Sequence, residues 1–353
     1  MNRFAAITLG AGLMSVLLSR AMAADQPPYP TPTPPVSFKA PYPTVGEIER
    51  YDPELDRLVP RDAKIEKLAT GMLWSEGPVW VKDGGYLLFS DVKANTTYKW
   101  QDGAGISVYL RPSGYFGTTW HSIEPGANGL TIDSQGRLTL CEHGERRVAR
   151  LDADKKQTAL ADHFEGKRFN SPNDVVFDSQ GNLYFTDPPY GLDGTFQSKQ
   201  KEMDYCGVFR ISKDGKVSLV TKELNAPNGI ALSPDEKTLY VANSDTNRAI
   251  WMAFGLKPDG TVANGRVFAD VTDLTKKGMV GNPDGMKVDK QGNVFATGPG
   301  GVFVFTPQGK RLGKIAPGDK TSNCAWGDDG HTLYITNNDK LVRIRLSTEG
   351  KQP

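Results

Sequence analysis

Residues 173–189 read NDVVFDSQGNLYFTDPP, and this stretch decides the fold. Two short apolar runs, VVF at 175–177 and LYF at 183–185, lie on either side of the turn sequence DSQG at 178–181. Runs of β-branched and aromatic residues around a Gly-containing turn predict a β-hairpin. Because a single hairpin is only marginally stable in water, the pattern has to recur if it is to build a domain.

The same pattern recurs along the chain: a polar leading residue, an apolar run and a turn. In the first five copies the turn position lies eight residues after the leading residue, and the sixth copy is looser. Leading residues are 39 to 56 residues apart, which suits the ~40–50 residues of a four-stranded propeller blade. The sequence therefore predicts an all-β, six-bladed β-propeller with four-stranded antiparallel blades around a central channel. The six leading residues are Glu76, Asn128, Asn173, Asn228, Asp284 and Asn323.

The N-terminal residues predict two segments ahead of the propeller. Residues 1–23 combine Arg3, an apolar stretch at 4–18 and the small-residue site Ala21-Met22-Ala23, which is typical of a Sec-type signal peptide. We expect cleavage near Ala23 and a periplasmic or secreted protein. Residues 24–51 are Pro-rich and favour extended chain, as a tether or a strap. The propeller is assigned to residues 52–353, closed by pairing residues 65–68 with residues 341–346.

The overall composition narrows the function classes. A net charge of +1 and a hydrophobic content of 38% indicate a globular chain with no electrostatic case for binding nucleic acid or an anionic membrane. The three cysteines, Cys141, Cys206 and Cys324, show no metal-binding spacing and are expected to be buried free thiols. The oligomeric state is left open.

The leading residues are expected to ring one mouth of the channel, since each begins the innermost strand of its blade. An isolated Asn before Gly is usually a turn residue, but six oxygen-bearing side chains in one register favour a shared site. Two of them, Glu76 and Asp284, are acids, and converging carboxylates repel unless a cation joins them. Oxygen donors without His or Cys suit one divalent cation, Ca²⁺ first, with Mg²⁺, Mn²⁺ or Zn²⁺ as alternatives.

Four segments carry a resemblance to a known family: WSEGPVW (74–80), SPNDVVFD (171–178), APNGIALS (226–233) and NPDGMKVD (282–289). They resemble the gluconolactonase/regucalcin (senescence marker protein) family, with diisopropylfluorophosphatase and the paraoxonases as more distant relatives. The likeness runs from about Asp52 to the end of the chain. It implies that one divalent metal is bound by Glu76, Asn173, Asn228 and Asp284. Asn128 and Asn323 are not standard ligands of the family, and we expect them either to face the substrate or to contact the metal ligands from behind.

Further substrate-binding residues are expected on the same face. The link 111–127, RPSGYFGTTWHSIEPGA, is long and aromatic, so Trp120 and His121 are predicted to belong to a lid or a substrate wall. Packing over a neighbouring blade is the alternative. His143 and Tyr190 follow second strands and are also predicted to contact substrate, although a lone His is often structural.

The predicted function is a divalent-metal-dependent hydrolase that opens a lactone, with a metal-polarised carbonyl and an activated water. Asp284 is predicted to be both a ligand and the general base. No G-x-S-x-G segment or triad signature argues for serine chemistry. Two alternatives remain: an arylesterase or phosphotriesterase of the same fold, and a non-catalytic, Ca²⁺-stabilised secreted propeller that binds a ligand. The lactonase and the esterase would both act on a small-molecule lactone or ester.

Overall fold

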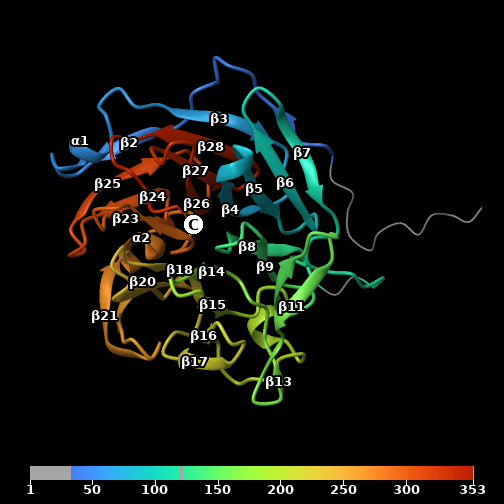
Figure 1. The fold of residues 1–353 in the computed structure, drawn as a ribbon. Coiled ribbons are helices and arrows are strands. Elements are labelled where there is room, and N and C mark those ends of the chain that lie inside the picture. Colours follow the sequence, from blue (N-terminus) through green and yellow to red (C-terminus); the bar gives the residue numbers. More distant parts are fainter. Residues whose placement is uncertain (1–32, 120–121, 353) are drawn as a thin grey trace, which may run out of the picture.

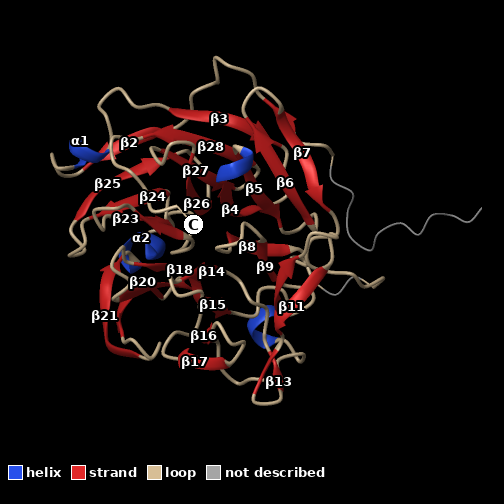
Figure 2. Cartoon of the chain, in the orientation of Figure 1, coloured by secondary structure: helices blue, strands red, loops and turns tan. Residues whose placement is uncertain are grey.

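The computed structural model describes residues 33–119 and 122–352. The predicted signal peptide, as well as Trp120 and His121, lies outside the described residues. Six antiparallel sheets stand around a common centre, which confirms the predicted six-bladed β-propeller (Figure 1). Helices are few and short in the described part of the chain, as Figure 2 shows; α1 (Leu55–Leu58) lies at the outer edge of the molecule, whereas α2 (Thr272–Lys276) lies nearer to its centre, close to β20.

Four consecutive strands form each of the first four blades, from the innermost strand outward. Their bounds are β4 (Ser75–Val81), β5 (Tyr86–Asp91), β6 (Thr96–Gln101) and β7 (Gly105–Leu110); β8 (Ala127–Ile132), β9 (Leu138–Glu142), β10 (Arg147–Leu151) and β11 (Gln157–Ala161); β14 (Val175–Phe177), β15 (Leu183–Asp187), β16 (Gly207–Ile211) and β17 (Val217–Thr221); and β18 (Pro227–Leu232), β19 (Thr238–Asp245), β20 (Arg248–Leu256) and β21 (Val262–Asp270). A small extra hairpin, β12 (His163–Phe164) with β13 (Lys167–Arg168), follows the second blade.

The last two blades each have five strands, because the N-terminal part of the chain contributes to both. Blade five contains β22 (Met286–Val288), β23 (Val294–Gly298), β24 (Gly301–Phe305), β25 (Arg311–Ala316) and, at its edge, β2 (Glu47–Arg50). Blade six contains β26 (Thr321–Gly327), β27 (Thr332–Asn337), β28 (Lys340–Arg345), β3 (Ile65–Thr70) and β1 (Val36–Ser37). Strands β1 and β2 lie within residues 24–51, so the described part of that segment straps the outside of two blades.

Pairing of β28 with β3 closes the ring, as predicted from residues 65–68 and 341–346. The register sets Ile344 opposite Ile65 and Arg343 opposite Glu66. Arg343 Nε also donates to Glu66 Oε2 at 2.8 Å. The two ends of the propeller are therefore joined by a sheet ladder within blade six.

The hairpin at 173–189 forms as predicted, and the geometry of its turn explains the sequence DSQG at 178–181. Val175 lies opposite Phe185 and Phe177 opposite Leu183. Asp178 Oδ1 accepts from the backbone N–H of Gln180 at 3.0 Å, and Gly181 adopts a φ of 86°. An Asp side chain that closes its own turn and a Gly free to take positive φ are the two requirements of this loop.

Apolar side chains fill the spaces between blades. Phe169, Phe185 and Phe209 form one such cluster, with ring centroids 5.0 to 5.5 Å apart. Fully burying an aromatic side chain of this size stabilises the fold by ~1.5–3 kcal/mol. The same cluster contains Cys141 and Val148 of the second blade, so it packs the second and third blades together. All three cysteines are free and buried, as expected. None of the described helices has the length and hydropathy needed to span a bilayer.

Candidate active site

The six leading residues converge at one mouth of the channel because the innermost strands approach one another closely. A Cβ on Gly77 would lie 2.0 Å from Asn128 O, and one on Gly229 would lie 2.1 Å from Asp284 O. Glycine after the leading residue therefore permits backbone contact between neighbouring blades. Five of the leading side chains are buried, at 2 to 5% exposure, and Asp284 is half-buried.

Second-strand hydroxyl groups fasten these innermost strands to the next blade. Ser90 Oγ donates to Asn128 O at 2.8 Å, and Thr186 Oγ1 donates to Asn228 O at 2.6 Å. The ladders of β4, β8, β18 and β26 also shift register at or beside the leading residue. Bulges of this kind turn a side chain out of the sheet, and here they aim the leading residues at the channel mouth.

Carboxylates gather at this mouth. Burial raises the pKa of Glu76, and the charges of Asp174 and Glu124 raise it further. Burial likewise raises the pKa of Asp284 well above its usual range, and the negative charge of Glu76 is the second cause of this increase. Burial raises the pKa of Glu124 to about 7. A carboxylate cluster of this kind is electrostatically costly and would be stabilised by a positive charge.

The amide oxygens near these acids differ in whether they have partners. Asn128 Oδ1 and Asn228 Oδ1 are buried and make no hydrogen bond within the described residues. Asn323 Oδ1, in contrast, accepts from the backbone N–H of Cys324 at 2.8 Å and from Lys287 Nζ at 3.4 Å. Buried acceptors without a donor are rare in folded proteins, so the free amide oxygens are suited to a ligand.

This donor set fits a hard divalent cation, because it consists of carboxylate and amide oxygens. No three His, Cys, Asp or Glu side chains of residues 33–119 and 122–352 are grouped to hold a metal ion. Cation binding at this mouth would therefore depend on the amide oxygens as much as on the acids. Glu76, Asn173, Asn228 and Asp284, predicted as ligands, all lie at this mouth.

His143 lies behind Asn173. Asn173 Nδ2 is 3.4 Å from His143 Nε2, and His143 Nδ1 is 3.3 Å from the carbonyl oxygen of Glu124. The imidazole is fully buried, and burial lowers the pKa of His143 to about 4. The ring is thus neutral near pH 7.

Tyr190 stands at the same mouth. Burial raises the pKa of its phenol, and the charge of Asp284 raises the pKa further. The ring packs edge-on against Phe196, with centroids 5.8 Å apart. The phenol keeps its proton at neutral pH and can donate a hydrogen bond.

The long link is tied to the turn after β9. Gly144 N donates to Pro125 O at 3.0 Å, and Glu145 N donates to Gly114 O at 2.9 Å. The described part of residues 111–127 therefore lies beside His143, at the face where a substrate wall was predicted. Contact of Trp120 and His121 with substrate stays a prediction.

Three residues at the channel were not singled out from the sequence. Asp174 is 2% exposed, and its Oδ2 accepts from the backbone N–H of Ile230 in the next blade at 3.1 Å. It occupies the position where four other copies have Gly, and this departure from the repeat could have identified it. Glu124 is one acid in an irregular link, and Lys287 is one cation within a strand; neither carried a signal.

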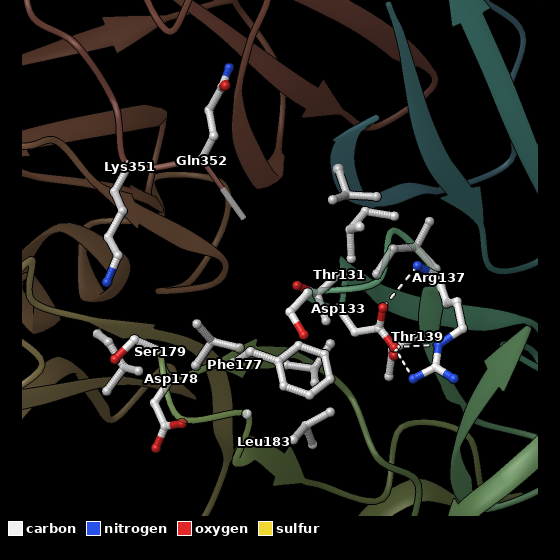
Figure 3. A pocket seen from close by; sticks show the side chains of 18 of the residues that line it. Thr131, Asp133, Arg137, Thr139, Phe177, Asp178, Ser179, Leu183, Lys351 and Gln352 are labelled. Atoms are coloured by element: carbon white, nitrogen blue, oxygen red, sulfur yellow. Dashed lines mark hydrogen bonds and ion pairs between the residues drawn. The ribbon is translucent and has the colours of Figure 1, made fainter. Parts of the chain in front are cut away.

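A large cavity lies in the other half of the channel, away from the leading residues. Its volume is about 990 Å³, and turn residues of several blades line it together with the C-terminal segment. Lys351 Nζ reaches Glu236 Oε1 at 2.8 Å across this mouth. Figure 3 shows the side chains around the opening, including Thr131, Asp133, Arg137, Phe177, Lys351 and Gln352. Asn128, Asn228, Glu76 and Asp284 do not line this cavity, so it is separate from the mouth where the leading residues lie.

Comparisons with known proteins agree with this architecture. Residues 74–339 match the family model described as SMP-30/Gluconolactonase/LRE-like region. The chain is 43% identical over 314 residues to the gluconolactonase of Zymomonas mobilis, covering 87% of this chain and 88% of the relative. It is 30% identical over 226 residues to the lactonase drp35 of Staphylococcus aureus, covering 61% of each.

A solved gluconolactonase structure from Xanthomonas campestris is also similar. The TM-score is 0.72 at 30% sequence identity, with 89% of this chain and 98% of that chain covered. The shared architecture thus extends over nearly the whole of both molecules.

Proposed function

Since this chain belongs to the SMP-30/gluconolactonase/LRE-like family, we propose that it is a lactone-hydrolysing enzyme that depends on one divalent cation, Ca²⁺ in the first place. The observation that carries the proposal is the ring of six leading residues, most of them buried, at one mouth of the channel. Carboxylates with raised pKa values lie at the same mouth as amide oxygens that make no hydrogen bond within the described chain. A periplasmic or secreted location, from the N-terminal residues, belongs to the same proposal.

The leading residues have two separate roles, cation binding and proton transfer. Glu76, Asn173, Asn228 and Asp284 would hold the cation, which supplies Lewis-acid polarisation of the lactone carbonyl when bound. Asp284 is half-buried and so remains open to the channel mouth. Its carboxylate would accept the proton of an attacking water once a bound cation offsets the neighbouring negative charges that raise its pKa. The burial of the other members excludes bulk water from the donor oxygens.

Substrate orientation falls to the neighbouring polar groups. The protonated phenol of Tyr190 can donate to an oxygen of the substrate. Asn128 and Asn323, on the two remaining blades, would face the ring hydroxyl groups of a sugar lactone. The polar character of this mouth supports an aldonolactone-type substrate, in agreement with the gluconolactonases to which the chain is similar.

A lactone panel tests the proposal. Purified protein would be assayed on glucono-1,5-lactone, aliphatic lactones, an aryl ester and a phosphotriester, with and without a chelator. We expect lactone turnover that chelation removes and Ca²⁺ restores. Turnover of the aryl ester or phosphotriester alone would assign the site to those substrates. No turnover of any compound, with a cation bound, would leave a binding propeller.

A further inference from the structure

A chain of polar contacts runs from the long link to the ring. The carbonyl oxygen of Glu124 lies 3.3 Å from His143 Nδ1, and His143 Nε2 lies 3.4 Å from Asn173 Nδ2. His143 is fully buried and Asn173 is 2% exposed, so water does not compete for these contacts. The imidazole is also confined sterically, because a Cβ on Gly191 would lie 2.5 Å from His143 Cβ.

The donors and acceptors in this chain allow one arrangement for a neutral ring. A backbone carbonyl can only accept, so the proton of His143 is on Nδ1. Nε2 then carries a lone pair and accepts from the Asn173 amide nitrogen. An amide whose nitrogen faces the imidazole turns its oxygen the other way. Asn173 Oδ1 is therefore directed away from His143.

We propose that His143 is a positioning residue: it locks the Asn173 amide with Oδ1 available to the cation, and the Glu124 carbonyl locks its tautomer. The inference rests on the cation site proposed above. It also gives residues 111–127 a role, since this link supplies the Glu124 carbonyl that holds the imidazole of His143. Asn323 shows the contrasting case, because its oxygen is occupied by Cys324 N and Lys287 Nζ.

The cation's affinity is the property that this arrangement should control. If the Asn173 amide rotated by half a turn, it would present N–H donors to a cation instead of an oxygen. Loss of an outer partner that orients a metal ligand typically weakens metal binding by ~10–100-fold. We expect a loss of that size when His143 can no longer accept a hydrogen bond.

Two substitutions at one position separate positioning from packing. His143→Gln can place an amide oxygen near the site of Nε2 and accept from Asn173, whereas His143→Leu has a similar size and cannot. Titration calorimetry with Ca²⁺ should give a Kd near the wild-type value for His143→Gln and a loss of ~10–100-fold for His143→Leu. His331→Leu is the matched control, since His331 also bonds a backbone carbonyl through Nδ1, at 2.9 Å from Thr348 O. It should leave the Kd unchanged.

A double-mutant cycle asks whether His143 acts through Asn173. In an Asn173→Ala background, His143→Leu should have no further effect on the Ca²⁺ Kd. Equal losses for His143→Gln and His143→Leu, or additive losses in the cycle, would overturn the proposal.

Nitrogen-15 NMR of the wild-type protein provides a measurement that needs no variant. A signal from His143 protonated at Nδ1 supports the proposal, and protonation at Nε2 overturns it. Failure of the proposed hydrolysis is a separate result, since it would appear as absence of lactone turnover by the wild type.

Discussion

Replacing Gly229 with Ala tests how closely the blades must approach to form the ring. Gly229 follows Asn228 in β18, and an added Cβ would lie 2.1 Å from Asp284 O. Ordinary contact begins at 3.4 Å, so β18 and the start of blade five would have to separate by about 1.3 Å. The residue does not have positive φ, so the effect is steric and not a matter of backbone strain.

The surroundings of Gly229 leave little room for relaxation. Thr186 Oγ1 holds Asn228 O at 2.6 Å, and Asp174 Oδ2 holds Ile230 N at 3.1 Å. Overpacking at a rigid site typically costs ~1–3 kcal/mol of unfolding free energy. Displacing reacting groups by about 1 Å can reduce the rate by ~10²-fold. We therefore expect Gly229→Ala to lower Tm, to weaken Ca²⁺ binding and to reduce kcat/KM on a lactone by about that factor.

Gly255→Ala is the control, because Gly255 lies in β20 of the same blade. Its added Cβ would meet only Ala263 O, at 3.3 Å, so the backbone needs almost no adjustment. Thermal unfolding, Ca²⁺ calorimetry and lactone kinetics would be measured for both variants. If Gly229→Ala behaves like Gly255→Ala in all three, the close approach of the innermost strands does not build the site.

Three further outcomes are expected. Removing the cation with a chelator should lower Tm, because a ligand at 100 times its Kd stabilises the folded state by ~2.7 kcal/mol; a Tm indifferent to Ca²⁺, Mg²⁺, Mn²⁺ and Zn²⁺ would contradict the cation site. At saturating cation, Asp284→Asn should lose ~10²–10⁴ in kcat through the missing base, whereas excess cation should restore most of the activity of Glu76→Gln; equal rescue of both would make Asp284 only a ligand. Shortening the link within residues 116–119 should raise KM or change substrate preference while the Ca²⁺ Kd is kept, and unchanged kinetics over the lactone panel would make the segment structural.

The repeat in the amino-acid sequence was enough to predict the architecture. The turn eight residues after each leading residue sets the strand period, and strand alternation is a local property of the backbone. The six blades were predicted on that basis and are confirmed. The pairing of β28 with β3 and the buried thiols, predicted on other grounds, are confirmed as well. The convergence of the leading residues at one mouth follows from the same repeat, since each begins an innermost strand.

The repeat does not determine in which direction a side chain points when that direction depends on contacts with distant segments. Asn173 and Asn323 occupy the same register, yet the nitrogen of one faces His143 and the oxygen of the other is held by Cys324 and Lys287. Glu124 reaches the site from an irregular link. From the Pro-rich segment, β2 pairs with β25 far along the chain, and β1 pairs with β3, which is itself paired with β28.

The division has a physical cause. Hydrophobic period and turn chemistry depend on residues a few positions apart. They establish the strands of each blade and the order of the blades along the chain. Hydrogen-bond donors and acceptors at the channel mouth meet only after six blades have packed, because their partners come from different blades and from the link. The sequence alone therefore determined which residues begin the innermost strands, and the tertiary structure decided which other groups meet them at the channel mouth and which of their atoms face it.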